Sequence, residues 1–307
     1  VADPHLMPEK LTEDSETFNN YLYTVDRMMK YTGFFLDVVE EDVKNNHPDI
    51  VIYPGDLTNN GSKVNHQEFE KHLKRVKATG AKVYVIPGNH DINNGKALYF
   101  KDNEIHKTES VTADEFVKIY SNYGYKDAVS MDENTLSYLV KPYKNLWFLM
   151  LDTTKDYPEP GGYINRDTLK WIENCSDMAK EESAEIIIVM HHNLLDHSEI
   201  IWEDYTVDNN TSVINTLHEC GIQVVLSGHI HIQDIKSHTS AETGNTIYDL
   251  ATGSLPVFAH KYGELVYSPS KGYDYETIKL NVEKYALDNK IEDENLLSFD
   301  EYSEELF

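Results

Sequence analysis

Short apolar runs alternate with longer amphipathic stretches along the chain. The runs are rich in Val and Ile and are bounded by Gly, Pro, Asn or Asp, which is typical of strands buried on both faces. The runs are Ile50 to Tyr53, Val83 to Ile86, Leu146 to Leu151, Ile186 to Met190 and Val224 to Leu226, with a later alternating run at Tyr273 to Val282. The amphipathic stretches have helical periodicity and cover Thr17 to Asn45, His66 to Thr79, Arg166 to Glu182 and Thr211 to Gly221. Strand and helix in repetition predict an α/β layered fold.

Residues 93–134 break this rhythm, because they are polar and contain one clear helical pattern. That helix is expected to begin at Thr112, which has the spacing of a capping box with Glu115. We therefore predict one domain over residues 1–285, with an insertion at about 93–134. A solvated acidic helix or tail is expected over residues 286–307.

The composition limits the classes of function. Asp and Glu total 53 against 27 Lys and Arg, so the 307 residues carry a formal net charge of −26. Such a charge repels phosphate backbones and disfavours nucleic acid as a partner, whereas a local metal site can still accept a small phosphorylated substrate. The chain is expected to be soluble and to span no membrane, because no apolar run approaches the roughly 18–20 residues that a membrane helix needs. Two locations are compatible with the sequence: the cytoplasm, or export with an N-terminal segment removed. Nothing in the composition indicates an oligomeric state.

Polar residues follow the ends of four apolar runs. Because parallel strands of an α/β sheet place their carboxyl ends at one edge, where ligands bind, these residues are expected at one rim. The groups are Gly55-Asp56, Gly88-Asn89-His90-Asp91, His191-His192 and Gly228-His229-Ile230-His231, and Asp3-Pro4-His5 has the same character. In extended backbone, the i, i+2 spacing of Asp3 with His5, and of His229 with His231, puts both side chains of a pair on one side.

The strand ends deliver side chains that can bind metal, namely Asp3, His5, Asp56, Asn89, His191, His229 and His231. These seven exceed the three or four protein ligands of one catalytic ion, whereas two ions that share a carboxylate would use them all. Imidazole, carboxylate and amide ligands together suit Mn, Fe, Zn, Co or Ni better than Ca or Mg. The sequence therefore predicts two divalent transition ions, with Mn, Fe or Zn favoured. Paired ions of this kind are a device for displacement at phosphorus.

The order of these groups over residues 3–231 resembles the calcineurin-like metallophosphoesterase superfamily. The resemblance implies a four-layer α/β-β/α sandwich, in which two mixed β-sheets pack face to face with flanking helices. The residue pattern by itself predicts α/β layers, and the second sheet comes from the resemblance. The resemblance also implies a hydrolase acting on phosphoric ester bonds, in which a hydroxide that bridges two metal ions attacks phosphorus.

Carried over residue by residue, the resemblance assigns Asp56 as the bridge between the two ions. It implies that the first ion is held by Asp3, His5, Asp56 and His231, and the second by Asp56, Asn89, His191 and His229. His90 matches the family histidine that contacts the phosphoryl group or protonates the leaving oxygen. Asp91 would orient His90, as carboxylates commonly do for imidazoles.

Other residues near these groups have weaker assignments. Asn59 is a candidate for substrate contact, although its place in Asn59-Asn60-Gly61 fits a turn equally well. His191 is preferred as the ligand over His192, because the family places the ligand immediately after the strand. His192 is then expected to support the site. Asp152 ends an apolar run at the same edge and is expected to hydrogen-bond near a ligand histidine.

A phosphodiesterase is the favoured activity, because the run of motifs most resembles the cyclic-nucleotide and glycerophosphodiester branch of the superfamily. A phosphomonoesterase or nucleotidase is the alternative. A non-catalytic interaction module of the same fold is a further alternative, but such relatives lose ligands or the histidine equivalent to His90, and this chain keeps them. The choice of substrate is expected to lie in the geometry of the insertion and the rim loops, and the choice of the two metals in metal availability.

Overall fold

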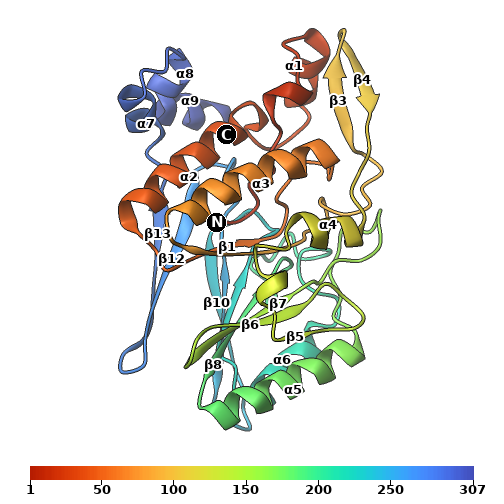
Figure 1. Ribbon diagram of the computed structural model, residues 1–307, viewed down its shortest axis with the longest axis vertical. Helices are drawn as coiled ribbons and strands as arrows, with labels where there is room; N and C mark the ends of the chain where they lie inside the picture. The colour runs from red at the N-terminus through yellow and green to blue at the C-terminus, as the bar shows by residue number, and fades with distance from the viewer.

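Two β-sheets lie face to face in the protein, whose computed structural model describes residues 1–307 (Figure 1). The larger sheet contains β5 (Ser130–Met131), β6 (Tyr138–Tyr143), β7 (Leu146–Leu151), β8 (Glu185–Met190), β9 (Val224–Ser227), β10 (Asp234–Thr239) and β11 (Thr246–Ala251). Its strand order is β10-β11-β9-β8-β7-β6-β5. The sheet is mixed, because β7, β8, β9 and β11 pair in parallel while β5, β6 and β10 pair in antiparallel fashion.

The smaller sheet is the parallel pair β1 (Ile50–Pro54) and β2 (Lys82–Ile86). Helices α2 (Thr32–Asn46) and α3 (Lys63–Ala78) cover its outer face, while α5 (Arg166–Glu182) and α6 (Asn210–Cys220) cover the outer face of the larger sheet (Figure 1). The antiparallel hairpin of β12 (Lys261–Ser268) and β13 (Gly272–Lys279) packs against the core beside the smaller sheet. This arrangement confirms the four-layer α/β-β/α sandwich. None of the helices has the length and apolar character needed to cross a membrane.

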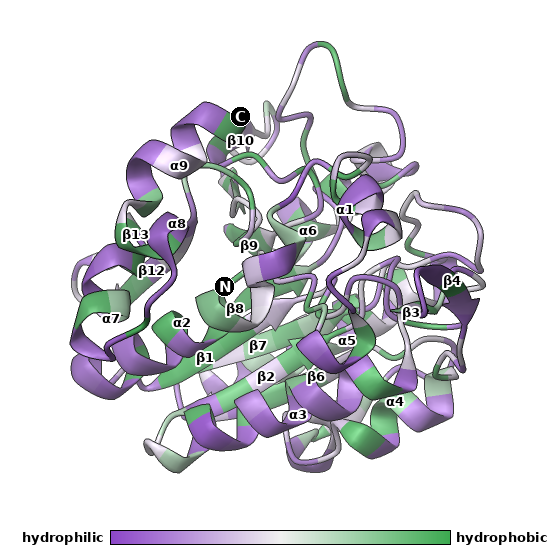
Figure 2. Cartoon of the chain, turned by 90° about the horizontal axis from the view of Figure 1, so that it is seen from above, coloured by the Kyte–Doolittle hydropathy of each residue, from purple (hydrophilic) through white to green (hydrophobic).

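Alternation along β7 shows why the larger sheet is buried on both faces. Phe148 and Met150 belong to the core between the two sheets, where Phe148 meets Tyr84 of β2. Trp147 and Leu149 point the other way, into the core shared with α5 and α6. Each residue of β7 is therefore buried, as its continuous apolar run predicts. In Figure 2, β1, β2 and β7 are accordingly coloured mainly as hydrophobic.

Most predicted elements are present. Each of the five apolar runs that predict buried strands matches a strand to within one residue at either end. Residues 93–134 form the hairpin of β3 (Leu98–Lys101) and β4 (Glu104–Lys107), helix α4 (Ala113–Ile119) and the edge strand β5. The predicted capping box between Thr112 and Glu115 is formed at the start of α4.

The prediction of one helix over Thr17 to Asn45 is wrong. Helix α1 (Glu16–Leu22) and α2 are separated by residues 23–31, which end in the 3-10 turn Met29–Tyr31. Within this break, the Met28 amide donates to the Pro256 carbonyl at 2.9 Å instead of to a carbonyl of its own helix. A long-range contact therefore overrides the local helical pattern.

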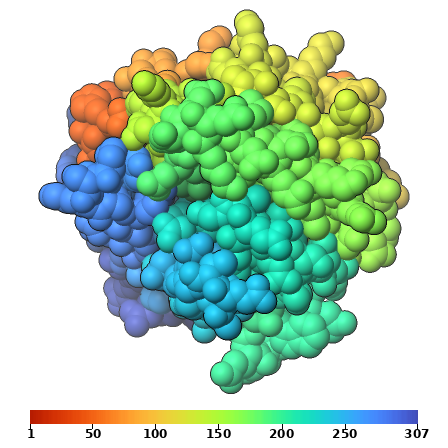
Figure 3. Space-filling model, turned by 90° about the horizontal axis from the view of Figure 1, so that it is seen from below, coloured from red at the N-terminus to blue at the C-terminus, as the bar shows by residue number.

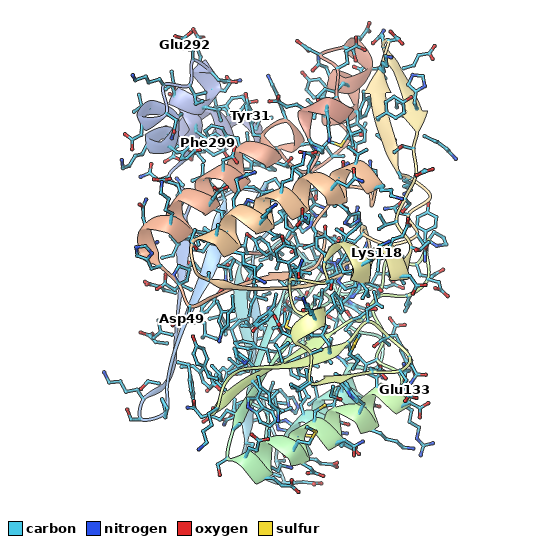
Figure 4. The ribbon with its side chains drawn as sticks, in the orientation of Figure 1. Tyr31, Asp49, Lys118, Glu133, Glu292 and Phe299 are labelled. Atoms are coloured by element: carbon cyan, nitrogen blue, oxygen red, sulfur yellow. The ribbon has the colours of Figure 1, made fainter.

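The acidic C-terminal residues are helical, and a few of their side chains pack on the core while most are exposed. Helices α7 (Val282–Asp288), α8 (Glu294–Leu297) and α9 (Phe299–Leu306) lie against the start of α2 (Figure 1). Phe299 is 1% exposed, and its ring lies 5.5 Å from that of Phe35. Figure 4 shows Phe299 and Tyr31 close together at this end of the molecule. Helix α7 runs across residue 285 and leads into these residues.

Candidate metal centre

The polar groups predicted at strand ends meet at one edge of the two sheets. Asp56 follows β1, Asn89 follows β2, His191 follows β8 and His229 follows β9. The N-terminal segment joins them by running parallel to the continuation of β1, with the His5 amide donating to the Asp56 carbonyl at 3.0 Å. Segments far apart in the sequence therefore place their side chains around one point.

The first group of candidate ligands consists of Asp3, His5, Asp56 and His231, whose ligand atoms lie within 4.8 Å of one another. His5 Nε2 is 3.0 Å from His231 Nε2 and 3.6 Å from Asp56 Oδ2. Asp3 Oδ1 lies 3.7 Å from His231 Nε2. Since Asp3 and Asp56 are at most 1% exposed, water contributes little to neutralising their charges.

The second group forms around His191. Its Nδ1 donates to the Pro54 carbonyl at 2.9 Å, which leaves Nε2 to face the centre. His191 Nε2 is 3.0 Å from Asn89 Oδ1 and 3.4 Å from Asp56 Oδ2. The same oxygen of Asp56 therefore faces both groups, and this is where the sequence predicts the bridging carboxylate.

His229 approaches the second group from the end of β9. Its ring packs on that of His191 with centroids 4.7 Å apart. Its Nε2 donates to the Asp204 carbonyl at 3.0 Å, so Nδ1 is the nitrogen left to bind a metal. Asp204 belongs to the segment near residue 200 that projects from one edge of the molecule in Figure 3.

His192 is close enough to His191 and His229 to share a metal ion with them. Both of its ring nitrogens, however, already have partners. Nδ1 accepts from Thr153 Oγ1 at 2.7 Å, and Nε2 donates to the Pro160 carbonyl at 2.8 Å. These hydrogen bonds favour His191 as the ligand and a supporting role for His192.

Glycines permit the close approach of ligands from different groups. A Cβ atom on Gly88 would overlap Asp56 Oδ1, and a Cβ atom on Gly228 would overlap Asp3 Oδ2. Any other residue at these positions would displace a carboxylate of the centre. The close packing of the site therefore explains why Gly88 and Gly228 stand at the start of their polar groups.

The buried charges shift one another's pKa values. Burial opposes ionisation of Asp56, but the His191 and His90 rings outweigh it and hold the pKa of Asp56 well below its usual range. Burial also disfavours a charged His191, yet the Asp56 carboxylate raises the pKa of His191 to about 9. Burial raises the pKa of Asp3 to about 6, against the opposing effect of His191. The buried carboxylates of the centre thus favour a positive charge beside them.

The donor set fits two metal ions. His191 Nε2 faces two oxygens, and His5 Nε2 faces another imidazole nitrogen, so lone pairs converge on one region. Buried atoms of this kind are costly unless cations lie among them. Mixed nitrogen and oxygen donors suit Mn, Fe or Zn. Because Asp56 faces both groups, they fit a dinuclear centre.

His90 lies beside the centre and is partly open to solvent. Its side chain is 29% exposed, and its Nε2 is 4.0 Å from Asp56 Oδ2. The orienting residue differs from the expected Asp91, because His90 Nδ1 donates to the Asn59 carbonyl. The Asp91 carboxylate is fully buried and instead accepts hydrogen bonds from the backbone amides of Leu57, Thr58 and Gly88. These amides hold Asp91 away from the His90 ring.

Two other candidate side chains also make contacts that differ from the expectation. Asn59 is 3% exposed, and its Nδ2 donates to Tyr21 Oη at 2.8 Å, so its side chain is committed within the protein. Asp152 accepts from the Leu136 and Thr154 amides and hydrogen-bonds to no histidine. Asn59 thus contributes through its backbone carbonyl rather than through direct substrate contact.

Arg27 and Tyr21 reach the site although no sequence pattern identified them. Arg27 Nη1 lies 2.7 Å from His5 Nε2. Tyr21 belongs to α1, and Arg27 lies in the interruption between α1 and α2. The only available signal is that Arg27, Arg75 and Arg166 are the three arginines of the chain, and rarity does not give a position in space.

A cavity of about 350 Å³ opens beside Asn89 and extends toward the end of β7. Its lining is mainly polar and includes the carboxylates of Glu133, Asp152 and Asp156. Lys155 also lines it, but its ammonium group is paired with Asp208 at 2.6 Å. The cavity therefore offers room and hydrogen-bonding groups for a small polar moiety next to the centre.

Comparison with known proteins places the chain among phosphoesterases. A family model described as calcineurin-like phosphoesterase matches residues 1–233. A probable glycerophosphodiester phosphodiesterase of Arcobacter nitrofigilis is 24% identical over 145 residues, which cover 47% of this chain and 42% of the relative. A probable cyclic nucleotide phosphodiesterase of Ruthia magnifica subsp. Calyptogena magnifica is 22% identical over 185 residues, which cover 60% of this chain and 62% of that relative. The chain thus matches between 42% and 62% of the length of these curated relatives.

Solved structures share the fold at low sequence identity. A dimetal phosphatase from Danio rerio has a TM-score of 0.57 and 14% identity, covering 92% of this chain and 98% of its own. The purple acid phosphatase PPD1 of yellow lupin has a TM-score of 0.50 and 12% identity, covering 80% of this chain and 48% of its own. At these identities, the likeness concerns the arrangement of sheets and helices.

Proposed function

The chain belongs to the calcineurin-like phosphoesterase family, and from that premise we propose that it is a metal-dependent hydrolase of phosphate esters that prefers phosphodiesters. One observation carries the proposal: a buried carboxylate, Asp56, faces two groups of nitrogen and oxygen donors at the ends of the strands. The preference for diesters is supported by the phosphodiesterase names of the curated relatives.

The seven candidate ligands divide between two ions in this proposal. Asp3, His5, Asp56 and His231 would hold one ion, and Asp56, Asn89, His191 and His229 would hold the other. Such ions supply a nucleophile near neutral pH and neutralise negative charge on the phosphoryl group. The protein fixes part of this ligand set in advance, because the carbonyls of Pro54 and Asp204 hold the rings of His191 and His229.

His90 would act on the substrate itself. The Asn59 carbonyl accepts the Nδ1 proton of His90, so Nε2 is the atom directed toward the centre. During hydrolysis, an oxygen derived from water forms a bond to phosphorus, and the bond from phosphorus to the alcohol oxygen breaks. His90 Nε2 would hydrogen-bond to the phosphoryl group or give the departing oxygen its proton.

The cavity beside Asn89 would receive an organic group of the ester. Its volume suits a small polar alcohol rather than a long chain or a polymer. The carboxylates of Glu133, Asp152 and Asp156 would repel a second phosphate or carboxylate on that group. These properties support a small phosphorylated molecule as substrate, in agreement with the strongly acidic composition.

The test uses the purified chain supplied with Mn²⁺, with bis-p-nitrophenyl phosphate as diester and p-nitrophenyl phosphate as monoester. We expect turnover of the diester with the higher kcat/KM, loss of turnover after chelation, and recovery when Mn²⁺ is returned. A higher kcat/KM for the monoester would overturn the diester preference. Bound metal without hydrolysis of either ester would overturn the enzymatic proposal and leave an interaction module.

A further inference from the structure

Arg27 is the arginine that reaches the candidate metal centre. Its side chain is 12% exposed, whereas Arg75 is 48% exposed in a surface ion pair and Arg166 begins α5 on the surface. Arg27 Nη1 lies 2.7 Å from Nε2 and 3.0 Å from Nδ1 of His5. A guanidinium group is thus buried against one of the candidate ligands, although the sequence motifs assign it no role.

The hydrogen-bonding capacity of Arg27 is largely unused. Its Nε is buried and makes no hydrogen bond. The Asp26 carboxylate lies 3.3 Å from that nitrogen, close enough for an ion pair but outside hydrogen-bonding geometry. Guanidinium carries five N–H donors in a planar fork that matches the oxygens of phosphate. The Arg27 guanidinium group, with N–H donors that lack partners, is therefore suited to an anionic ligand.

The charges around the centre make such a cation useful. Asp3 and Asp56 are buried there, and the whole chain carries a net charge of −26, so an anionic ester meets an unfavourable field. Lys155 lies beside the neighbouring cavity, but Asp208 already neutralises it at 2.6 Å. Arg27 has no comparable hydrogen-bonded carboxylate.

We propose that Arg27 binds the phosphoryl oxygens of the substrate, an inference that rests on the proposed function as a phosphoesterase. Arg27 Nη1 lies 2.7 Å from His5 Nε2, so the guanidinium group would be repelled when His5 holds a cation. The flexible side chain would then turn outward, where its open donors would meet the oxygens of the bound ester. Arg27 thereby adds a cationic contact to the phosphoryl group from a segment that contributes no metal ligand.

The test compares the metal-loaded wild type with Arg27→Met, Arg27→Lys and the surface control Arg166→Met. Metal content is measured by elemental analysis, and the affinity for inorganic phosphate by calorimetry. Steady-state kinetics with bis-p-nitrophenyl phosphate separate KM from kcat. In Arg27→Met we expect unchanged metal content, phosphate binding roughly 10- to 100-fold weaker, and a raised KM, because hydrogen bonds to charged groups are lost. Arg27→Lys should recover part of the affinity, since it keeps the charge but not the fork.

Two results would overturn this inference. One is phosphate affinity in Arg27→Met equal to that of the wild type, with both samples holding the same metal. The other is loss of metal in Arg27→Met and in Arg27→Lys, which would make Arg27 a support for His5. Failure of the proposed function is distinguishable, because the metal-loaded wild type itself would then hydrolyse neither ester.

Discussion

Two regions of the chain meet at the candidate metal centre, and they are held in different ways. Asp56 and His191 follow buried strands that are fixed by parallel sheet pairing. Residues 15–31 reach the same centre on a short helix and a loop. They are held by a small satellite core around Phe18 and Met29, by Met28 and Tyr31 in the main core, and by single hydrogen bonds such as that between Asn59 and Tyr21. The strand ends are therefore suited to fixing metal ligands, and residues 15–31 to placing groups that adapt to a substrate.

The two regions also differ in backbone conformation. Left-handed φ angles occur at Asp3 (48°), His5 (43°), Asp56 (47°), His229 (64°) and His231 (62°), which are candidate ligands at the strand ends. Each such non-glycine residue costs on the order of 1 kcal/mol or more, and it persists where the surroundings determine it. Residues 15–31 contain no positive φ angle. Five of the candidate ligands thus carry this cost, and residues 15–31 carry none of it.

The largest effect is expected from Asp56→Ala, because its carboxylate faces both groups. We expect loss of both ions and a fall in turnover of more than about 1,000-fold, since metal ions supply several kcal/mol of charge stabilisation. Elemental analysis and diester kinetics measure the two quantities. Asp177→Ala on the surface of α5, where the carboxylate side chain is 74% exposed, is the matched control. Retention of two ions by Asp56→Ala would refute the bridging assignment.

His191 and His192 are adjacent at the end of one strand, so substitution of each in turn tests which one binds the metal. His191→Ala should weaken binding of the second ion. The fall in affinity should exceed the roughly 10- to 100-fold that is lost when a residue supporting a ligand is removed. His192→Ala should keep both ions, because the ring nitrogens of His192 are bonded to Thr153 and Pro160. Metal titration of each variant measures the affinities. The opposite pattern would exchange the two roles.

His90→Ala should retain both metals and lower turnover by about 10²- to 10⁴-fold if the ring acts as an acid. The loss should be greater for an alkyl ester than for a nitrophenyl ester, because a poor leaving group depends more on proton donation. Steady-state kinetics with both kinds of diester measure it. Unchanged kcat on the poor leaving group would remove His90 from this role.

The smallest effect is expected from Tyr21→Phe, which tests whether residues 15–31 position the substrate side of the site. It removes the hydroxyl that accepts from Asn59, whose carbonyl orients His90. A hydrogen bond contributes about 0.5–1.5 kcal/mol, so a fall in kcat of roughly 2- to 10-fold is expected, with metal content unchanged. Tyr23→Phe, at an exposed position of the same segment, is the control. Equal kcat in the two variants would contradict a positioning role for Tyr21.

The two regions also differ in how far the sequence predicts them. The strand ends are encoded locally, since an apolar run followed by Gly-Asp or Gly-His indicates both the strand and the polar rim. The break at residues 23–31 depends on the bond from Met28 to Pro256, a contact across more than two hundred residues that no local pattern contains. The sequence pattern therefore places Arg27 within a helix and gives no sign that it reaches the metal centre. Residue types and spacing could not reveal which of its neighbours it would meet.

Other differences have similar causes. The strands β1 and β2 have the same apolar character as those of the larger sheet, so the pattern predicts strands but not their division between two sheets. Asp91 sits next to His90 in sequence, but three backbone amides draw its carboxylate into the interior. Phe299 lies in an acidic stretch and is buried because α9 packs against Phe35. Each outcome depends on tertiary contacts.

The central claim is that the strand ends hold two metal ions, and elemental analysis of the purified wild-type chain tests it most directly. The chain is incubated with Mn²⁺, freed of unbound metal and analysed for Mn, Fe and Zn together. About two transition ions per chain are predicted, as two donor groups sharing Asp56 require. One ion or none per chain, in protein that is folded by circular dichroism, would contradict the account.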